Sequence, residues 1–152
     1  MLRSEAAGLY YWENYQKTRN TFVGGGWVTN NDLFWRDQEG NYWFAGRADD
    51  LVKVRGTFVS PGEIEACLER HPAIAECAVV AVEDEDGLTT TKAFVATREG
   101  FAPSEVLIRD IQEFAKQRLA PHKYPRHVGF LPDLPKTGQG KINRRRLREI
   151  GI

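Results

Sequence analysis

The segment Gly46–Glu65 (GRADDLVKVRGTFVSPGEIE) constrains the fold more than any other part of the chain. The adjacent carboxylates of Asp49 and Asp50 repel each other and can hydrogen-bond to their own backbone, so we expect an extended run to break or swivel there. Residues 51–55 then mix apolar and charged side chains, which predicts a short half-exposed strand that ends at Gly56. The sequence therefore predicts a hinge between two bodies.

A helix is predicted to begin directly after this hinge. Ser60 is expected to be the N-cap, Pro61 the first helical residue, and Glu63 the partner that closes a capping box. The helix is expected over Pro61–Arg70, with an inward face formed by Ile64, Cys67 and Leu68. His71 precedes a proline, and a residue before proline avoids the helical region. The helix should therefore end there, with His71 beside its C-terminal dipole.

The remaining C-terminal part alternates strands and helices. Ala75–Val82 and Thr91–Thr97 are rich in β-branched residues and predict two strands, and Val128–Leu131 predicts a third. Apolar residues recur at helical spacing along Pro103–Leu119. The acidic stretch Glu83–Gly87 lacks the ligand spacing of an EF-hand and is expected to be a solvated hairpin tip. The predicted fold class is α+β: a small β-rich N-terminal segment, a hinge, and a compact domain with a roughly three-stranded sheet flanked by helices.

Aromatic side chains dominate the N-terminal part. Leu9–Thr21 places them at helical spacing, and we expect the aromatic face of that helix to pack in a core rather than to bind a ligand. Gly24–Gly26 predicts a turn, without the Lys and the Ser or Thr that follow in a phosphate-binding loop. Aromatic runs on both sides of Asp37–Gly40 predict a hairpin whose aromatics line the inside of a small sheet or barrel. Met1–Glu5 has the pattern of a strand, with no cap or turn before it, so we expect the chain to begin within a larger protein.

Composition argues against several classes of partner. Lys and Arg together number 21, as do Asp and Glu, so the 152-residue chain has no net charge and no basic footprint for nucleic acid. The absence of a run of 18 apolar residues argues against a membrane partner. Cys67 and Cys77 lie far from any histidine cluster, and we expect reduced thiols that pack in a core, with no metal site. The chain is expected to be cytoplasmic.

Two places in the sequence are candidates for chemistry. The loop 134–143 (LPKTGQGKIN) contains glycines that let its backbone lie close to a ligand, and Lys141 stands near its end. An ammonium there could neutralise the charge that develops as an acyl oxygen attacks phosphorus; a basic surface tail that touches RNA or acidic lipid is the alternative. Asp32, at the end of a predicted strand, could accept two hydrogen bonds from a vicinal diol, with a plain turn role as its alternative.

Several motifs resemble those of the adenylate-forming superfamily, which includes acyl- and aryl-CoA synthetases, firefly luciferase and the adenylation domains of peptide synthetases. The family's last core motif, P-K-T-x-x-G-K-I-x-R, is matched over residues 135–144, and LAPHKYP at 119–125 is also similar to a family signature. Within the superfamily, the amino-acid sequence looks most like those of benzoate and hydroxybenzoate CoA ligases. The family's hinge motif, G-R-x-D and then K-x-R/S-G with E-I-E shortly after it, is matched by Gly46, Arg47, Asp49, Lys53, Arg55, Gly56, Glu63, Ile64 and Glu65.

The resemblance implies roles for residues of the hinge and of the C-terminal loop. Lys141 corresponds to the lysine that catalyses adenylation, and Asp49 corresponds to the pivot of the hinge. After the lid has swung about that pivot, the segment from Lys53 to Gly56 is implied to lie beside the pantetheine tunnel, where the CoA thiol displaces AMP.

The resemblance also implies a nucleotide site in the N-terminal part. Asp32 corresponds to the aspartate of the motif W-x-x-T-G-D-L, which binds the ribose hydroxyls of ATP, and Arg47 corresponds to a nucleotide-binding arginine. The chain departs from this motif because Asn30 and Asn31 replace the Thr-Gly pair. Asparagine can adopt the left-handed conformation that glycine normally supplies, so we expect the turn to be retained.

The division of the chain follows from the same resemblance. Residues 1–48 correspond to the end of a large N-terminal domain, and residues 49–152 to the C-terminal lid of an ATP-dependent carboxylate–CoA ligase for an aromatic acid. ATP or AMP, CoA and Mg²⁺ belong to the full-length enzyme, and the sites for Mg²⁺ and the carboxylic acid lie in the N-terminal domain that is the lid's partner. We therefore expect the chain alone to be inactive.

Two other functions remain open on the sequence. The chain could be a stand-alone binding or regulatory module that docks a partner through Ala120–Arg126 and Arg144–Arg148. The presence of Asp49 and Lys141 argues against that function, because docking needs neither residue. The chain could also be a fragment of an adenylation domain that loads a carrier protein. That fragment differs from a CoA ligase in whether CoA or a phosphopantetheinyl protein discharges the adenylate.

Overall fold

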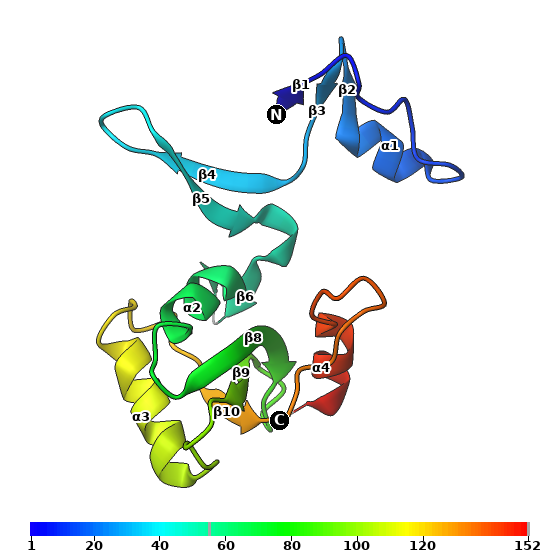
Figure 1. The fold of residues 1–152 in the computed structure, drawn as a ribbon. Helices are drawn as coiled ribbons and strands as arrows, with labels where there is room; N and C mark the ends of the chain where they lie inside the picture. The colour runs from blue at the N-terminus through cyan, green and yellow to red at the C-terminus, as the bar shows by residue number, and fades with distance from the viewer. Residues whose placement is uncertain (55, 152) are drawn as a thin grey trace. The chain divides into compact units, whose positions relative to one another are not determined.

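The computed structural model describes residues 1–54 and 56–151, together with their side chains except those of residues 45 and 49. Arg55 of the hinge motif and the side chain of Asp49 therefore lie outside the described part. The chain divides into two compact units, Met1–Asp49 and Asp50–Ile152, each with its own strands and helices (Figure 1).

The first unit contains a small sheet, one helix and a hairpin (Figure 1). The sheet has the order β1-β3-β2 and is antiparallel throughout, and β4 pairs with β5 in a separate antiparallel hairpin. A short 3-10 turn, η1 (Ala48–Asp50), follows β5. The bounds in chain order are β1 (Leu2–Arg3), α1 (Tyr15–Thr21), β2 (Phe22–Gly24), β3 (Trp27–Val28), β4 (Asp32–Arg36) and β5 (Tyr42–Arg47).

The helix of the first unit is shorter than predicted. Asn14 is its N-cap and accepts a hydrogen bond at Oδ1 from the backbone N of Lys17 at 3.0 Å, so the helix begins at Tyr15 and not at Leu9. The expected burial of the aromatic face is also wrong within this chain. The large side chains before and at the start of α1 are exposed, namely Leu9, Tyr10, Tyr11, Trp12 and Tyr15.

The β4–β5 hairpin is present as predicted, but its aromatic residues are exposed and line no barrel. Trp35 and Trp43 stack with ring centroids 5.9 Å apart, and Phe34 and Phe44 meet edge to face at 5.7 Å. The indole N–H of Trp43 donates to Asp37 at 2.8 Å. Each ring keeps more than half of its surface in contact with solvent because only two strands form this sheet. The aromatic rings therefore contact each other across the two strands instead of being buried in a core as predicted.

The second unit is the predicted α+β domain with a three-stranded sheet. Its strand order is β10-β9-β8, in which β8 and β9 are antiparallel and β10 runs parallel to β9. A short hairpin, β6–β7, precedes the first helix, and only its first strand was predicted. The bounds are β6 (Val52–Val54), β7 (Thr57–Val59), α2 (Pro61–Leu68), β8 (Ile74–Glu83), β9 (Thr89–Thr97), α3 (Glu105–Lys116), β10 (His127–Phe130) and α4 (Arg144–Ile150).

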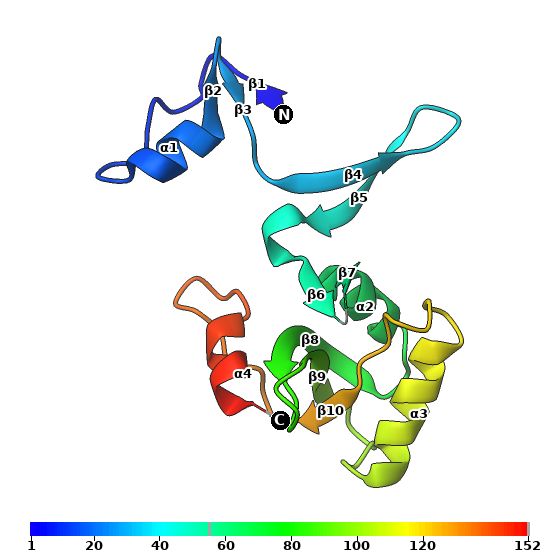
Figure 2. The same cartoon turned by 180° about the vertical axis from the view of Figure 1, so that it is seen from behind.

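Both faces of the three-stranded sheet are buried. Alternate residues of a strand point to opposite faces, and along β8 Val79 belongs to one apolar cluster while Ala78 and Val80 belong to the other. Helices α2 and α3 supply the first cluster with Ile64, Leu68, Leu107, Ile111 and Ala115, and α4 supplies the second with Leu147. Figures 1 and 2 accordingly show α3 and α4 at opposite sides of this sheet. The core of the unit thus has helix, sheet and helix layers.

Helix α2 begins where the sequence predicts, with Ser60 as N-cap and Pro61 in the first turn. The predicted capping box does not form. The carboxylate of Glu63 instead receives Lys123 Nζ, which lies 2.8 Å from both carboxylate oxygens. The ammonium partner is charged, and a charge-assisted bond is stronger than one to a neutral backbone N–H.

His71 does more than complement the dipole of α2. Its side chain is buried, Nδ1 accepts a hydrogen bond from Ala73 N at 3.2 Å, and Nε2 lies 3.3 Å from a carboxylate oxygen of Asp110 on α3. The ring also meets Phe114 edge to face at 4.9 Å. The residue therefore also joins the end of α2 to α3, a role that the sequence did not predict.

The segment after α3 is turned rather than extended. Lys123 N donates to Ala120 O at 2.8 Å, which closes a turn, and Pro125 at its end is buried in the domain. Among the residues described, no helix is both long enough and apolar enough to cross a bilayer.

Candidate functional site

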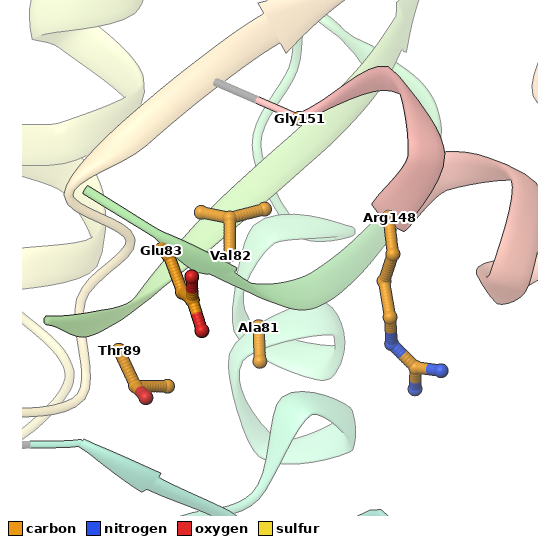
Figure 3. A pocket seen from close by; sticks show the side chains of 6 residues that line it. All are labelled: Ala81, Val82, Glu83, Thr89, Arg148 and Gly151. Atoms are coloured by element: carbon orange, nitrogen blue, oxygen red, sulfur yellow. The ribbon is translucent and has the colours of Figure 1, made fainter. Parts of the chain in front are cut away.

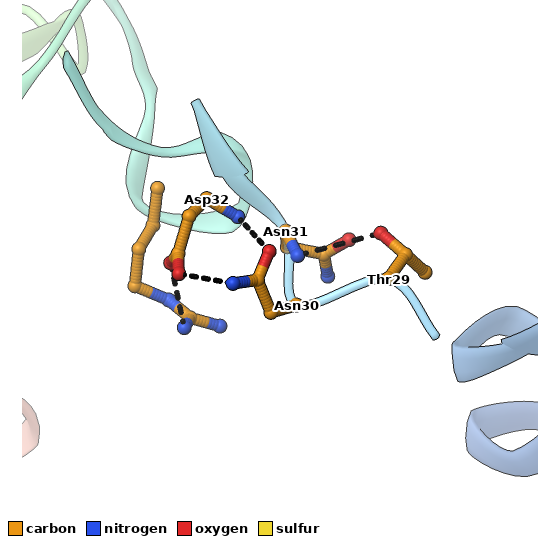
Figure 4. A network of polar contacts seen from close by, with 5 residues as sticks. Thr29, Asn30, Asn31 and Asp32 are labelled. Carbon is orange, nitrogen blue, oxygen red and sulfur yellow. Dashed lines mark hydrogen bonds and ion pairs between the residues drawn. The ribbon is translucent and has the colours of Figure 1, made fainter. Parts of the chain in front are cut away.

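Asp32 and Arg47 meet because of the register of the β4–β5 hairpin. The two residues are direct partners across the strands, and Arg47 Nη1 lies 3.3 Å from Asp32 Oδ1. Asn30 Nδ2 donates to the other carboxylate oxygen at 2.6 Å, and Asn30 Oδ1 accepts from Asp32 N at 3.1 Å (Figure 4). The structure thus brings the two residues of the predicted nucleotide site together in one polar network.

The turn before Asp32 is retained despite the two asparagines. Asn31 has a φ of 60°, the left-handed conformation that was expected of it, and its carbonyl accepts a hydrogen bond from Ala48 N at 2.7 Å. The side chain of Asp32 is 24% exposed and has a donor at each oxygen. Each carboxylate oxygen has two lone pairs, so the network keeps the capacity to accept further hydrogen bonds from a pair of hydroxyl groups.

Lys53 and Gly56 lie on the β6–β7 hairpin, and both are exposed. Lys53 is in β6 opposite Phe58 of β7. Gly56 has a φ of 88°, and no heavy atom would lie within 4 Å of a Cβ placed there, so the turn requires glycine for its backbone and not for space. The backbone of Asp49, the predicted pivot, lies in η1 between two strands and not within a continuous strand.

Lys141 lies on the loop between β10 and α4, and the base of this loop is closed. Thr137 N donates to the carbonyl of Lys141 at 2.7 Å, and Lys136 and Ile142 form an isolated antiparallel bridge. Gly140 has a φ of 77° and donates to Thr137 O at 2.9 Å, which turns the tip of the loop. The side chain of Lys141 is exposed and has no hydrogen bond or ion pair with another residue in the described part of the chain. The loop therefore places this ammonium group in solvent.

The sequence analysis missed two ion pairs that flank this loop. Lys136 Nζ lies 3.1 Å from a carboxylate oxygen of Glu76, and Arg144 Nη2 lies 2.7 Å from both carboxylate oxygens of Glu65. Residues 65 and 144 are both motif positions, but they are 79 residues apart and no local pattern pairs them.

Neither cysteine has the properties of a reactive thiol. Both side chains are buried. Burial raises the pKa of the Cys77 thiol from its ordinary 9.0 to about 12, and burial also raises the pKa of Cys67. Both side chains pack in the core, as predicted. Among the described residues, no group of three or more His, Cys, Asp or Glu side chains could hold a metal ion.

One surface hollow of about 450 Å³ lies beside α4, and none of the predicted catalytic, hinge or nucleotide-binding residues lines it. It is lined by Glu83 and Arg148, whose charges are opposite, and by Ala81, Val82, Thr89 and Gly151 (Figure 3). The residues in Figure 3 come from the end of β8, from the start of β9 and from the end of α4. Among its lining residues, Arg148 belongs to the segment Arg144–Arg148 that the alternative of a docking module would use.

Comparison with known proteins identifies the family. The profile of the AMP-binding enzyme C-terminal domain matches residues 63–141, just over half of the chain. The benzoate–CoA ligase of Thauera aromatica is 46% identical over 143 residues, which are 94% of this chain and 27% of that enzyme. The acetyl-coenzyme A synthetase of Bacillus subtilis is 45% identical over 137 residues, which are 90% of this chain and 24% of that enzyme.

A solved structure agrees with this assignment. The anthranilate CoA ligase AuaEII, in complex with anthranoyl-AMP, superposes with a TM-score of 0.86 at 45% identity, over 98% of this chain and 29% of that one. The chain thus spans about a quarter of the length of the relatives it matches. It belongs to the AMP-binding enzyme C-terminal domain family, the C-terminal part of adenylate-forming acyl- and aryl-CoA ligases.

Proposed function

We propose that this chain is the lid of an ATP-dependent carboxylate–CoA ligase and that Lys141 is its adenylation lysine. The observation that carries the proposal is the exposed ammonium of Lys141, which pairs with no other described residue, near the end of a loop whose base is closed by hydrogen bonds. A lysine placed this way can enter a site on another domain without first breaking an ion pair of its own. In this proposal, residues 1–48 are the end of the N-terminal domain and residues 49–152 form the lid.

In the first half-reaction, a carboxylate oxygen attacks the α-phosphorus of ATP, and pyrophosphate leaves. Negative charge develops on the phosphoryl oxygens between the two reactants, and the ammonium of Lys141 stabilises it there. Asp32 accepts hydrogen bonds from the ribose hydroxyls, and Arg47 contributes a second contact to the nucleotide. The Asp32–Arg47 network described above supports this role, because it holds both side chains before a ligand arrives.

In the second half-reaction, the CoA thiol attacks the acyl carbon of the adenylate, and AMP leaves. The lid turns about Asp49 between the two steps, which removes Lys141 and brings the hairpin of Lys53 and Gly56 to the thiol channel. The position of Asp49 in a 3-10 turn between β5 and β6 supports a pivot at that point, because a turn absorbs dihedral change more readily than a strand does.

The carboxylic acid and Mg²⁺ bind to the N-terminal domain, so we expect the isolated chain to show no acid-dependent release of pyrophosphate. We propose aromatic acids as the substrate class, because ligases for benzoate and anthranilate are among the similar proteins. An acetyl-coenzyme A synthetase is similar to nearly the same degree. A comparison of benzoate and acetate with the full enzyme that carries this chain therefore tests the class directly.

The test of the two residue roles uses the chain joined to the N-terminal domain of the Thauera aromatica enzyme. Lys141→Ala is expected to lower the rate of adenylation by about a hundredfold or more while thioester formation from supplied acyl-adenylate continues. Asp49→Pro is expected to impair thioester formation alone. Gln139→Ala, on the same loop, is the matched control. Full adenylation by Lys141→Ala would reject the proposed function.

A further inference from the structure

The ion pair between Glu65 and Arg144 joins α2 to the residues that follow Lys141. Arg144 Nη2 lies 2.7 Å from each carboxylate oxygen, and the side chains of Glu65 and Arg144 are only 13% and 33% exposed. A partly buried pair is screened less by salt than a surface pair. Arg144 is three positions beyond Lys141 and is the first residue of α4. The pair therefore fixes the point at which the loop rejoins the domain.

The carboxylate of Glu65 also bonds to the sheet. Its Oε1 accepts a hydrogen bond from Val79 N at 2.7 Å, and Val79 is fully buried in β8, which is an outer strand of the sheet. The outward backbone N–H groups of an outer strand have no partner strand, and a buried N–H needs an acceptor. One carboxylate thus satisfies a buried donor and holds Arg144 in place.

The ion pair acts on a loop that is already closed at its base. Asn143 N donates to Pro135 O at 2.7 Å, in addition to the hydrogen bond from Thr137 to Lys141. Ile142 packs against the apolar cluster that contains Leu134 and Leu147. The backbone on both sides of Lys141 is therefore tied to the domain, while the side chain of Lys141 is exposed.

We propose that Glu65 and Arg144 are positioning residues for Lys141. The pair holds the base of the loop at one place on the lid and so determines where the ammonium group arrives when the lid closes. The inference rests on the proposed function for its catalytic consequence, although its effect on the loop can be measured without any reaction. Misplacing a charged group by about 1 Å is enough to lower a rate by about a hundredfold.

The contact geometry allows the two bonds of Glu65 to be separated by substitution. Glu65→Gln keeps an oxygen for Val79 N and removes the charge that attracts Arg144. Arg144→Met removes the charge at the other end. Arg144→Lys is the rescue variant, because a single nitrogen makes both contacts and Nε of Arg144 has no hydrogen-bond partner in the described structure. Arg145→Met is the matched control, since among the described residues Arg145 pairs only with Glu149 on its own helix, and it is 88% exposed.

The first measurement is amide hydrogen exchange on the full 152-residue chain. We expect Arg144→Met to lower the protection of the Thr137, Gly140 and Asn143 amides by about tenfold, with the β8–β9 amides unchanged. Arg144→Lys should restore most of the protection, and Arg145→Met should have no effect. Equal protection of the loop amides in Arg144→Met and the unsubstituted chain overturns the inference. If Arg144→Met does not fold, the same comparison is made with Glu65→Gln and Arg144→Lys.

The second measurement is steady-state adenylation by the joined enzyme. We expect Arg144→Met and Glu65→Gln to lower kcat for adenylation by about tenfold to a hundredfold, with little change in KM for ATP and none in thioester formation from supplied acyl-adenylate. A fold that was merely loosened would impair both half-reactions. Unchanged adenylation by Arg144→Met, with Lys141→Ala inactive, overturns this inference alone. Full adenylation by Lys141→Ala overturns the proposed function and this inference with it.

Discussion

The two units of the chain use their apolar side chains in opposite ways. Among the described residues of Met1–Asp49, only Gly46 is buried, and the unit exposes its tryptophans, tyrosines and phenylalanines to varying degrees. The unit Asp50–Ile152 buries two apolar clusters on the two faces of one sheet. Apolar packing therefore stabilises the fold of the second unit, whereas turns, cross-strand ring pairs and polar networks stabilise the first.

The largest expected difference between the units is in thiol reactivity. In the native fold, the pKa of the Cys77 thiol is raised from its ordinary 9.0 to about 12. Near pH 8 the native protein therefore contains about a thousandfold less Cys77 thiolate than the unfolded chain. In a Cys67→Ser background, native Cys77 should react with iodoacetamide about a thousandfold more slowly than in urea.

The matched control places a thiol in the first unit. Trp12 is 78% exposed, and Trp12→Cys should react at nearly the same rate in native buffer and in urea. The raised pKa of Cys77 also means that its contribution to stability is complete below pH 9 and is lost as the pH rises towards 12. Fast alkylation of native Cys77 would show that the second unit opens as readily as the first.

A large difference in stability is expected for truncation of apolar side chains. Ile111 is fully buried between α3 and the sheet, and Ile111→Ala should lower the free energy of unfolding by about 2–5 kcal/mol. Phe44 is 62% exposed in the first unit, and Phe44→Ala should change the free energy of unfolding by less than about 0.5 kcal/mol. Urea unfolding followed by far-UV circular dichroism measures both. Similar losses would mean that the hairpin shares the core of the domain.

Helix caps offer a smaller comparison, matched in chemistry. Ser104 Oγ accepts from Leu107 N at 3.2 Å in α3, and Asn14 Oδ1 accepts from Lys17 N at 3.0 Å in α1. Ser104→Ala should cost about 1 kcal/mol in the cooperative unfolding transition, because α3 is part of the core. Asn14→Ala should leave that transition unchanged, since α1 buries no residue. An equal shift in the urea midpoint for both variants would contradict the separation of the two units.

The smallest expected effect concerns the turn before Asp32. Asn31 has a φ of 60°, which glycine adopts without strain, so Asn31→Gly should change the exchange protection of the Ala48 amide by less than about threefold. Asn31→Val should lower that protection by about tenfold, because a β-branched residue is strained at positive φ. If the Ala48 amide exchanges at the same rate in both variants, the turn does not depend on the left-handed conformation of residue 31.

The sequence predicted the second unit better than the first, and the physical reason is burial. The strands Ala75–Val82 and Thr91–Thr97 are rich in β-branched residues, and the helix Pro103–Leu119 has apolar residues at helical spacing. All three elements are present with small changes at their ends. In the first unit the same apolar signals led to a helix from Leu9 and to buried aromatics, both of which are wrong. Periodicity shows that a face is apolar, but it does not show what covers that face.

Contacts between distant segments limited the prediction of the candidate sites. Asp32 and Arg47 meet through the register of a short hairpin, which lies within the range of local pattern analysis. Glu63 was assigned to a capping box, but its partner is Lys123, 60 positions away. The pairing of Glu65 with Arg144 was likewise invisible, because only the packing of α4 against the sheet brings them together. Long-range ion pairs depend on tertiary structure, which local propensity does not encode.

The hydrogen bond between the Glu65 carboxylate and Val79 also bears on solubility. An outer strand with open backbone groups can recruit a strand from another molecule, and this is a common route to aggregation. The outward N–H of Val79 already donates to the carboxylate of Glu65, which is paired with Arg144, so it is not open to a strand from another molecule. A recruiting strand would have to displace a charged group from its partner, so self-association through this part of β8 is disfavoured by the same contact that ties down α4.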